Sequence, residues 1–454
     1  MNHTRSLTEG NIASSLARFA IPVLLTLFLQ ALYGGVDLLV VGQFASTADV
    51  SGVATGSMLL QTATMIITGL AMGVTVLVGE KIGENRPDEA GRAIGSGICL
   101  FGTASVILSL ILIASAGSLA KLMHAPDDAL SQTAAYIRIC GAGAIFITAY
   151  NLLGSVFRGI GDSKTPFLTV CIACLVNIGG DLLLVAVFRM GAAGAALATV
   201  AAQAVSVIVS LILIRKRALP FSFSRDYLRF DKTFIVKELK LGTPVALQEF
   251  LVGVSFLVIQ AIVNSFGVTA SAGVGVAEKV CTFIMLVPSA YMQSMSAFVA
   301  QNMGAGNPGR AKKALVCGII SSFAAGLLMA YLAFFHGDLL ASIFARDADV
   351  IVNAHDYLRA YAIDCMLTPF LFCFTGYYNG REKTMFVMAQ GLAGAFGVRI
   401  PVACLMSRIP GASLFQIGLG TPASSAVQIM LCLWMFWRME RKGKTSRNIS
   451  TPIG

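Results

Sequence analysis

Two aspartates and two further oxygen-bearing side chains lie in apolar stretches of this 454-residue chain, where almost no other charged group occurs. Asp37 is an isolated charge in LYGGVDLLVVGQF, and Asp181 lies in VNIGGDLLLV, one helical turn after Asn177. Thr199 follows in GAAGAALATVAAQ. A carboxylate that faced lipid would cost several kcal/mol, so these groups should face the protein interior and have a use there.

That use depends on the aspartates lying close together. Two neighbouring carboxylates cannot both stay ionised without a counter-charge, so the pair would take up a proton or hold Na⁺. Amide and hydroxyl oxygens would complete the ligands of Na⁺. We therefore predict a coupling-cation site for Na⁺ or H⁺ at Asp37, Asn177, Asp181 and Thr199. The alternative is a network of interhelical hydrogen bonds that only joins the helices.

The elements that must position these residues are membrane-spanning helices. The chain is 56% hydrophobic and only 12% charged, with a mean hydropathy of +0.78, whereas soluble domains carry about 25% charged residues. Apolar runs long enough to cross a bilayer recur along the whole chain, without the alternation of a barrel. We predict twelve spans, near 16–42, 52–79, 94–117, 131–156, 166–188, 192–214, 238–264, 273–301, 314–335, 355–379, 385–407 and 413–437.

The distribution of basic residues predicts the orientation of these spans. With a cytoplasmic N-terminus, the inner segments carry 25 of the 33 Lys and Arg residues and the outer loops carry 4. This asymmetry follows the positive-inside rule, so both termini should be cytoplasmic and the protein should lie in the plasma (cytoplasmic) membrane. It also accounts for the net charge of +10, because basic residues spread over seven inner segments do not form a nucleic-acid-binding face.

Counted along the predicted helices, the four polar residues lie at similar depths in the membrane. Asp37 and Asp181 each lie about seven residues, roughly 10 Å, before the outer end of their spans. Thr199 lies at a similar depth, roughly 12 Å into the span that returns inward. Asn177 shares a helical face with Asp181 because residues four apart stack along a helix. All four thus fall in one layer of the outer half of the membrane.

The chain contains an internal repeat. GEKIGENRPDEAGRA at 79–93 matches AQNMGAGNPGRAKKA at 300–314 with an offset of 221, and Pro22 matches Pro244 with an offset of 222. Six spans separate the copies, so both have the same orientation, as in transporters with parallel repeats. We predict an all-α polytopic membrane protein whose twelve helices form two pseudo-symmetric six-helix lobes around a central cleft. The lobes would be residues 1–214 and 238–440, with a cytoplasmic linker at 215–237 and a cytoplasmic tail at 441–454.

The first span carries further candidates. Pro22 removes a backbone hydrogen bond and should allow a bend about four turns from Asp37. Gln30 and Tyr33 share a face with Asp37 and could line the cleft below it, or could only pack.

No enzyme chemistry is indicated. The ten cysteines and four histidines show no metal-ligand spacing, and neither a catalytic triad nor a phosphate-binding loop occurs. We expect no cofactor besides the coupling ion Na⁺ or H⁺, no nucleic-acid partner, a lipid bilayer as surroundings, and a monomer.

The sequence resembles the MATE (multidrug and toxic compound extrusion) antiporters of the MOP flippase superfamily over essentially its whole length. The stretches that carry the resemblance are IPVLLTLFLQALYGGVDLLVVGQF, VNIGGDLLLV, GAAGAALATVAAQ, AQNMGAGNPGRAKKA and RIPVACLM. The resemblance implies a cation site at Asp37, Asn177, Asp181 and Thr199, and alternating-access exchange of Na⁺ or H⁺ for organic, cationic or amphipathic drugs and toxins leaving the cell.

The second half departs from one branch of this family. NorM-type members carry an acidic residue deep in the seventh span, whereas Glu249 here lies nearer the cytoplasmic end, so that branch's second cation site is not carried over. Gln248 and Glu249 could line the cleft and contact substrate, or could be a polar helix end. The alternative function is a flippase or exporter for a lipid-linked saccharide or an endogenous metabolite. Only Lys279 and Arg399 lie clearly within spans, which disfavours binding of a pyrophosphate headgroup.

Overall fold

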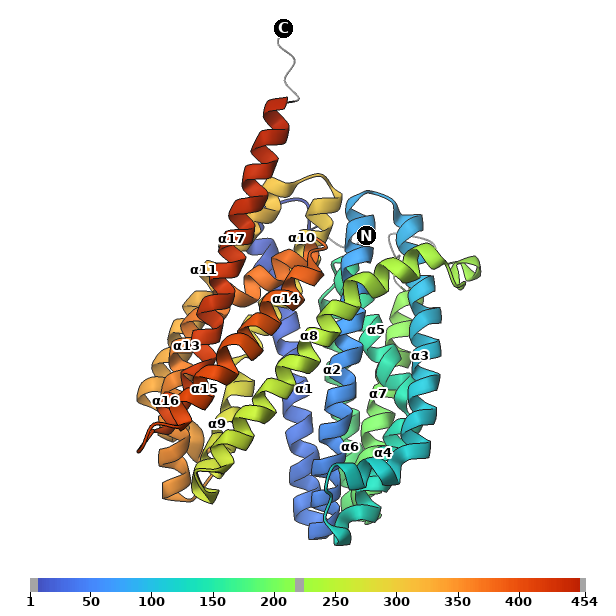
Figure 1. Ribbon diagram of the computed structural model, residues 1–454. Coiled ribbons are helices and arrows are strands. Elements are labelled where there is room, and N and C mark those ends of the chain that lie inside the picture. Colours follow the sequence, from blue (N-terminus) through green and yellow to red (C-terminus); the bar gives the residue numbers. More distant parts are fainter. Residues whose placement is uncertain (1–6, 217–223, 450–454) are drawn as a thin grey trace. The chain divides into compact units, whose positions relative to one another are not determined.

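The computed structural model describes residues 7–216 and 224–449, and the chain is helical throughout, with no strand in this part (Figure 1). The first half contains α1 (Ile12–Phe44), α2 (Thr47–Gly83), α3 (Pro87–Leu122), η1 (Asp127–Ala129), α4 (Leu130–Ala142), α5 (Ala144–Ile160), α6 (Lys164–Asp181), the π-helical η2 (Leu182–Val187) and α7 (Gly191–Lys216). The second half contains η3 (Arg225–Tyr227), α8 (Lys232–Asn264), α9 (Val268–Ile284), α10 (Leu286–Gly304), α11 (Pro308–Phe335), α12 (Gly337–Ser342), α13 (Ala348–Gly380), α14 (Thr384–Gly394), the π-helical η4 (Ala395–Arg399), α15 (Ile400–Ser407), α16 (Leu414–Gly418) and α17 (Gly420–Ile449).

The number of spans agrees with the twelve predicted from the sequence. Ten segments of the described chain are long and apolar enough to cross a membrane, and the total reaches twelve if each of two bent helix pairs counts as one span. The predicted class, a helical polytopic membrane protein, is confirmed.

Two predicted spans are broken rather than continuous. α4 and α5 meet at 55° beside Gly143, where a Cβ atom would lie 2.4 Å from Val200, so only glycine lets α7 approach the joint. α9 and α10 meet at 41°, with Pro288 in the first turn of α10. Proline lacks the N–H for the next helical hydrogen bond, and its ring clashes with the carbonyl four residues earlier.

The described chain divides into two compact units. Unit 1 comprises residues 1–250, 293–314 and 379–384, and unit 2 comprises residues 251–292, 315–378 and 385–454. The six-helix lobes expected from the repeat stay a prediction about domains.

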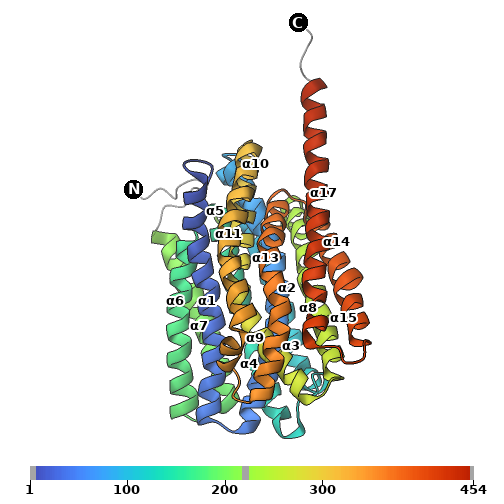
Figure 2. The same ribbon diagram turned by 90° about the vertical axis from the view of Figure 1, so that its left-hand side faces the viewer.

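Unit 1 contains α1 to α7, packed side by side. α6 lies against α1 and α7, while α2 packs on α4 and α5 (Figures 1 and 2). Apolar side chains from α2, α3 and α5 form one buried cluster, and residues from α1 to α5, η2 and α7 form another. Burial of these faces holds the polar segments of α1, α6 and α7 next to one another.

The two copies of the repeated motif also meet within unit 1, through reciprocal glycine contacts. A Cβ atom on Gly83 would lie 2.0 Å from the backbone oxygen of Gln301, and one on Gly304 would lie 2.2 Å from the backbone oxygen of Glu80. Both pairs are related by the offset of 221, so the ends of α2 and α10 cross in a two-fold arrangement that excludes side chains. The Gln301 amide also donates to the Gly159 oxygen at 2.8 Å.

Three charged side chains lie close to this crossing. Lys237 Nζ is 2.6 Å from Glu80 Oε2 and 2.7 Å from Glu382 Oε1. Partial burial acts to raise the pKa of the Glu382 carboxyl, but hydrogen bonds with Lys237 and Glu80 outweigh it and hold this pKa below its usual range. The ammonium thus joins the start of α8 to α2 and to the turn between α13 and α14.

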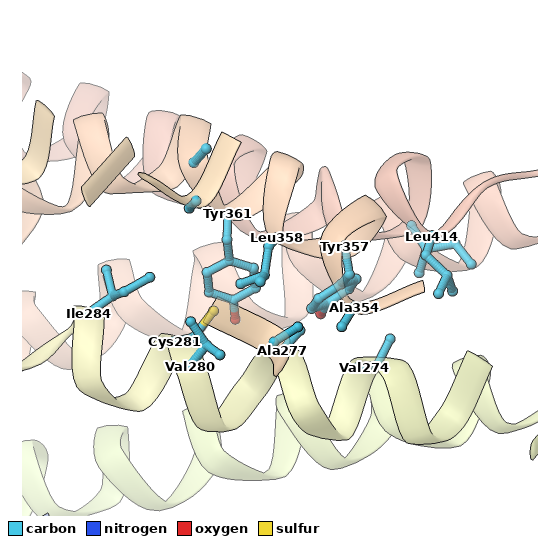
Figure 3. Close-up of a cluster of buried hydrophobic side chains, with 14 of the residues drawn as sticks. Val274, Ala277, Val280, Cys281, Ile284, Ala354, Tyr357, Leu358, Tyr361 and Leu414 are labelled. Atoms are coloured by element: carbon cyan, nitrogen blue, oxygen red, sulfur yellow. The ribbon is translucent and has the colours of Figure 1, made fainter. Parts of the chain in front are cut away.

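Unit 2 has its own apolar core, built from α9, α13 and parts of α8, α11 and α15 to α16. Figure 3 shows Tyr357 and Tyr361 of α13 above Ala277, Val280 and Cys281 of α9. The tyrosine rings lie 5.5 Å apart, so aromatic packing fills this core.

Candidate cation site

The structure brings the four predicted cation-site residues together inside unit 1. The Thr199 hydroxyl of α7 donates to Asp37 Oδ2 of α1 at 3.2 Å. Asp37 also interacts with Asn177 and Asp181 of α6. Asp37 is 6% exposed, and Asn177 and Asp181 are fully buried.

Local features of α6 explain this placement. Asn177 and Asp181 are four residues apart on one face, and Asp181 ends the α-helical part of the segment, where η2 begins. π-Helical turns are rare and occur frequently at functional sites. Gly180 permits close approach of α7, because a Cβ atom there would lie 3.0 Å from Ala198, the neighbour of Thr199.

Several buried polar atoms of the site have no hydrogen-bond partner in good geometry, although Asn177 and Asp181 lie close enough to Asp37 to interact with it. These are Asp37 Oδ1, both side-chain polar atoms of Asn177 and both carboxylate oxygens of Asp181. Among the described residues, no Lys or Arg interacts electrostatically with the carboxylate of Asp37 or with that of Asp181. Buried polar groups are almost always hydrogen-bonded, and buried charges are paired. The arrangement therefore suits a proton or a small cation bound by oxygen atoms.

Two residues near the site were missing from the predicted set. Tyr136 of α4 interacts with both aspartates and with Thr199, and Cys140, one turn later, interacts with Asp37. The repeat contained a signal for the tyrosine, since YIR at 136–138 matches YLR at 357–359. Gly56 accommodates its ring, because a Cβ atom there would lie 2.5 Å from Tyr136.

The remaining candidates of α1 lie on the side of the site toward Pro22. Tyr33 interacts with Asp37 and with Tyr150 of α5, and the Gln30 amide donates to the Tyr150 hydroxyl. Pro22 lies within the continuous helix α1, and its carbonyl accepts a hydrogen bond of 2.7 Å from Thr26. A bend of α1 at Pro22, and a cleft-lining role for Gln30 and Tyr33, stay predictions.

Gln248 and Glu249 are not part of this cluster. Both are half-buried on α8, and neither acts on Asp37 or Asp181 in the described part of the chain. Gln248 Oε1 is buried without a hydrogen-bond partner. Their role in substrate contact stays a prediction.

The second copy of the repeat has no equivalent cluster. At the offset of 222 that relates Pro22 to Pro244, Asp37 corresponds to Ile259 and Asp181 to Ala403, and both are buried in the apolar core of unit 2. Asn177 corresponds to Arg399, whose guanidinium donates to Ser255 Oγ at 3.0 Å and lies 4.3 Å from the Phe256 ring centre. The repeated helices therefore pack without carboxylates at these positions.

Replacing Thr199 by Val tests the contact of the hydroxyl with Asp37. For Na⁺, the variant loses one oxygen ligand, and since a hydrogen bond or ligand contact to a charged group contributes about 1.5–3 kcal/mol, we expect the Na⁺ concentration for half-maximal transport to rise roughly tenfold. For H⁺ we expect the opposite, because the lost hydrogen bond stabilised the ionised carboxylate, so the proton concentration for half-maximal transport should fall. This is measured by titrating Na⁺ and H⁺ in reconstituted vesicles. Thr103→Val is the control, because the exposed Thr103 hydroxyl bonds only to the Cys99 carbonyl. An unchanged cation dependence would contradict a ligand role for Thr199.

Comparison with known proteins gives a family match for this chain. The MatE family model matches residues 22–183 and again residues 244–405, two segments related by the same offset of 222 that relates Pro22 to Pro244. The chain is 25% identical to the probable multidrug resistance protein YoeA of Bacillus subtilis over 98% of both proteins. It is 27% identical to the FAD transporter of Shewanella oneidensis over 83% of this chain and 84% of that protein.

Solved structures share the fold. The crystal structure of a MATE protein in complex with MaL6 superposes with a TM-score of 0.91 at 18% identity, covering 98% of this chain and 100% of the other. The sequence-based assignment is thus confirmed, and with it the expectation of a transport protein that is not an enzyme. With both copies of its repeat matched, the chain belongs to the MatE family of membrane transporters.

Proposed function

We propose that this protein is a secondary antiporter that exports small organic compounds, cationic or amphipathic in character, in exchange for Na⁺ or H⁺. The cation binds at Asp37, Asn177, Asp181 and Thr199. Cation binding and substrate binding alternate as the protein changes which side of the membrane it faces.

One observation carries this proposal. Two buried carboxylates lie beside each other with oxygen atoms that have no donor, while the second copy of the repeat fills the equivalent positions with Ile259 and Ala403. Packing alone therefore does not account for the aspartates. A cation or proton supplies the counter-charge that the chain does not provide.

The orientation of the protein follows from its charges. The basic residues favour cytoplasmic termini in the plasma membrane, which puts the crossing of α2 and α10 on the cytoplasmic side and the cation site in the outer half. Cations that enter the site from outside and leave inward would then drive export. We expect the monomer to be the transporting unit.

A specific observation favours a second candidate substrate class. The Shewanella relative is an FAD transporter and the Bacillus relative a probable multidrug resistance protein. An endogenous metabolite is therefore the alternative cargo. A lipid-linked saccharide is less favoured, because Arg399 is already held by Ser255 and Phe256, and the same shortage of free basic groups within the spans counts against the pyrophosphate of FAD, so FAD serves here as a test cargo.

The test is substrate efflux from proteoliposomes under an imposed ΔpH or an imposed Na⁺ gradient, with cationic dyes and FAD as separate cargoes. We expect one of the two gradients to drive dye export, and that gradient identifies the coupling ion. Dye transport that ignores both gradients would contradict the antiport. FAD export without dye export would favour the metabolite transporter.

A further inference from the structure

Glu238 is a buried acid that the proposed antiport does not use. It lies two turns into α8, in the part of this helix that belongs to unit 1. Its side chain is 1% exposed, and neither carboxylate oxygen has a hydrogen-bond partner. A buried ionised carboxylate without any donor is among the costliest groups in a protein interior.

The surroundings of Glu238 are backbone and apolar side chains. Its two carboxylate oxygens lie 3.4 and 3.5 Å from where a Cβ atom on Gly97 of α3 would be, with Val74 of α2 alongside. Its backbone oxygen lies 2.4 Å from the corresponding position on Gly73 of α2. Gly73 thus lets α2 approach the backbone of α8 closely, and α3 packs on the carboxyl group of Glu238 at Gly97.

No charged group compensates for the carboxylate. The nearest charged residues along the packed elements are Lys237 and Lys240 on α8, Glu80 on α2, Arg92 on α3, and Arg225 and Asp226 on η3. Lys237 forms ion pairs with Glu80 and Glu382. No charged residue of this set interacts electrostatically with Glu238.

The repeat shows that packing does not require an acid at this position. Pro22 and Pro244 are equivalent, and the residues six positions before them are Leu16 and Glu238. Leu16 is also 1% exposed. The first copy therefore fills the position with an apolar side chain, whereas the second copy has a carboxyl group without a partner.

We propose that Glu238 is a proton-binding site separate from the Asp37–Asp181 site, which takes up a proton when α8 packs on α2 and α3 and releases it when this packing opens to water. The ligand is a proton rather than a metal ion, because Na⁺ or Ca²⁺ needs several oxygen ligands. The described residues contain no group of three or more His, Cys, Asp or Glu side chains suited to a metal.

The consequence is a response to pH on one side of the membrane. In the orientation proposed above, α8 begins on the cytoplasmic side, roughly 9 Å from Glu238 along the helix. The proton would then enter and leave on that side, so Glu238 carries no net charge across the membrane. Acidic cytoplasm would favour the packed state of α2, α3 and α8, and alkaline cytoplasm would favour its opening.

The test is amide hydrogen exchange of the full chain in lipid nanodiscs from pH 6 to pH 9 at constant Na⁺, corrected for the intrinsic exchange rate. Each opening of the wild-type packing releases one proton as long as the packed carboxyl is protonated and the opened one is ionised. Over that pH range the opening constant in residues 69–77, 95–101 and 234–246 should rise about tenfold per pH unit, and it should level off where the packed carboxyl ionises as well. In Glu238→Leu, which copies Leu16, and in Glu238→Gln, this local rise should vanish. Peptides covering residues 30–40 contain Asp37 and serve as an internal reference, because their exchange should be the same in wild type and in the Glu238 variants.

Glu9→Gln is the matched control, because its side chain is exposed, its backbone oxygen accepts from Arg310, and its carboxylate interacts electrostatically with Arg310, away from Glu238. It should keep the wild-type pH dependence. Identical pH dependence in wild type and Glu238→Leu would overturn the proposal, as would failure of both neutral variants to fold. The measurement requires no substrate or gradient, so its outcome is independent of whether the proposed antiport is correct.

Discussion

Asp37→Asn and Asp181→Asn should each reduce gradient-driven efflux to less than about one tenth of the wild-type rate, since each removes one of the two buried charges that attract the cation. Asparagine has nearly the same size as aspartate, so the packing of α1, α6 and α7 should be kept. The measurement is initial efflux in proteoliposomes under whichever gradient, ΔpH or Na⁺, drives the wild-type protein. Binding of the substrate without a gradient, measured separately, should persist.

The control for this experiment is Asp128→Asn, which makes the same chemical change at an exposed residue of η1. It should transport at the wild-type rate. Full coupled transport by Asp37→Asn would remove the basis of the cation site and would favour the alternative of interhelical hydrogen bonds. In that case the variant's thermal stability, rather than its transport, should be lowered.

The second large effect is expected at the crossing of α2 and α10. Gly83→Ala and Gly304→Ala each place a Cβ atom 2.0–2.2 Å from a backbone oxygen, a distance that the helices can relieve only by separating. Overpacking typically costs 1–3 kcal/mol, and we expect about 3 kcal/mol here because backbone atoms are the obstacle. Chemical or thermal unfolding in detergent would measure this loss of stability.

The double variant distinguishes this mechanism from two local defects. If one separation of the helices relieves both clashes, the double variant should cost clearly less than the sum of the single variants. Gly102→Ala on α3 is the control, because a Cβ atom there meets nothing within 4 Å, and alanine should stabilise the helix by up to about 1 kcal/mol. Wild-type stability in Gly83→Ala would show that the crossing is not tightly packed.

The sequence alone determined the features that depend on position along a helix. Apolar runs and basic segments predicted the spans, because the bilayer sets their length and excludes their charges. The fixed rise per residue placed Asp37, Asp181 and Thr199 at one depth, and the period of the helix put Asn177 on the same face as Asp181. In the structure all four residues lie together within unit 1, where Asp37 accepts a hydrogen bond from Thr199 and interacts with Asn177 and Asp181.

Only the tertiary structure decided which side chains meet laterally. Tyr136 joins the cluster because α4 packs against α2 and α7 and Gly56 leaves space for the ring. The broken spans could not be predicted from hydropathy, because a bend at glycine or proline leaves the apolar composition unchanged.

Glu238 shows the difference most clearly. In the sequence it is one acid beside basic residues at the start of a span, which suggests a solvated helix end. In the structure, Gly73 lets α2 approach closely and α3 packs on the carboxyl group at Gly97, so that Glu238 is only 1% exposed. Periodicity specifies depth and face, whereas the approach of a neighbouring helix depends on small residues distant in the chain, and this approach decides whether a carboxyl group is hydrated or buried.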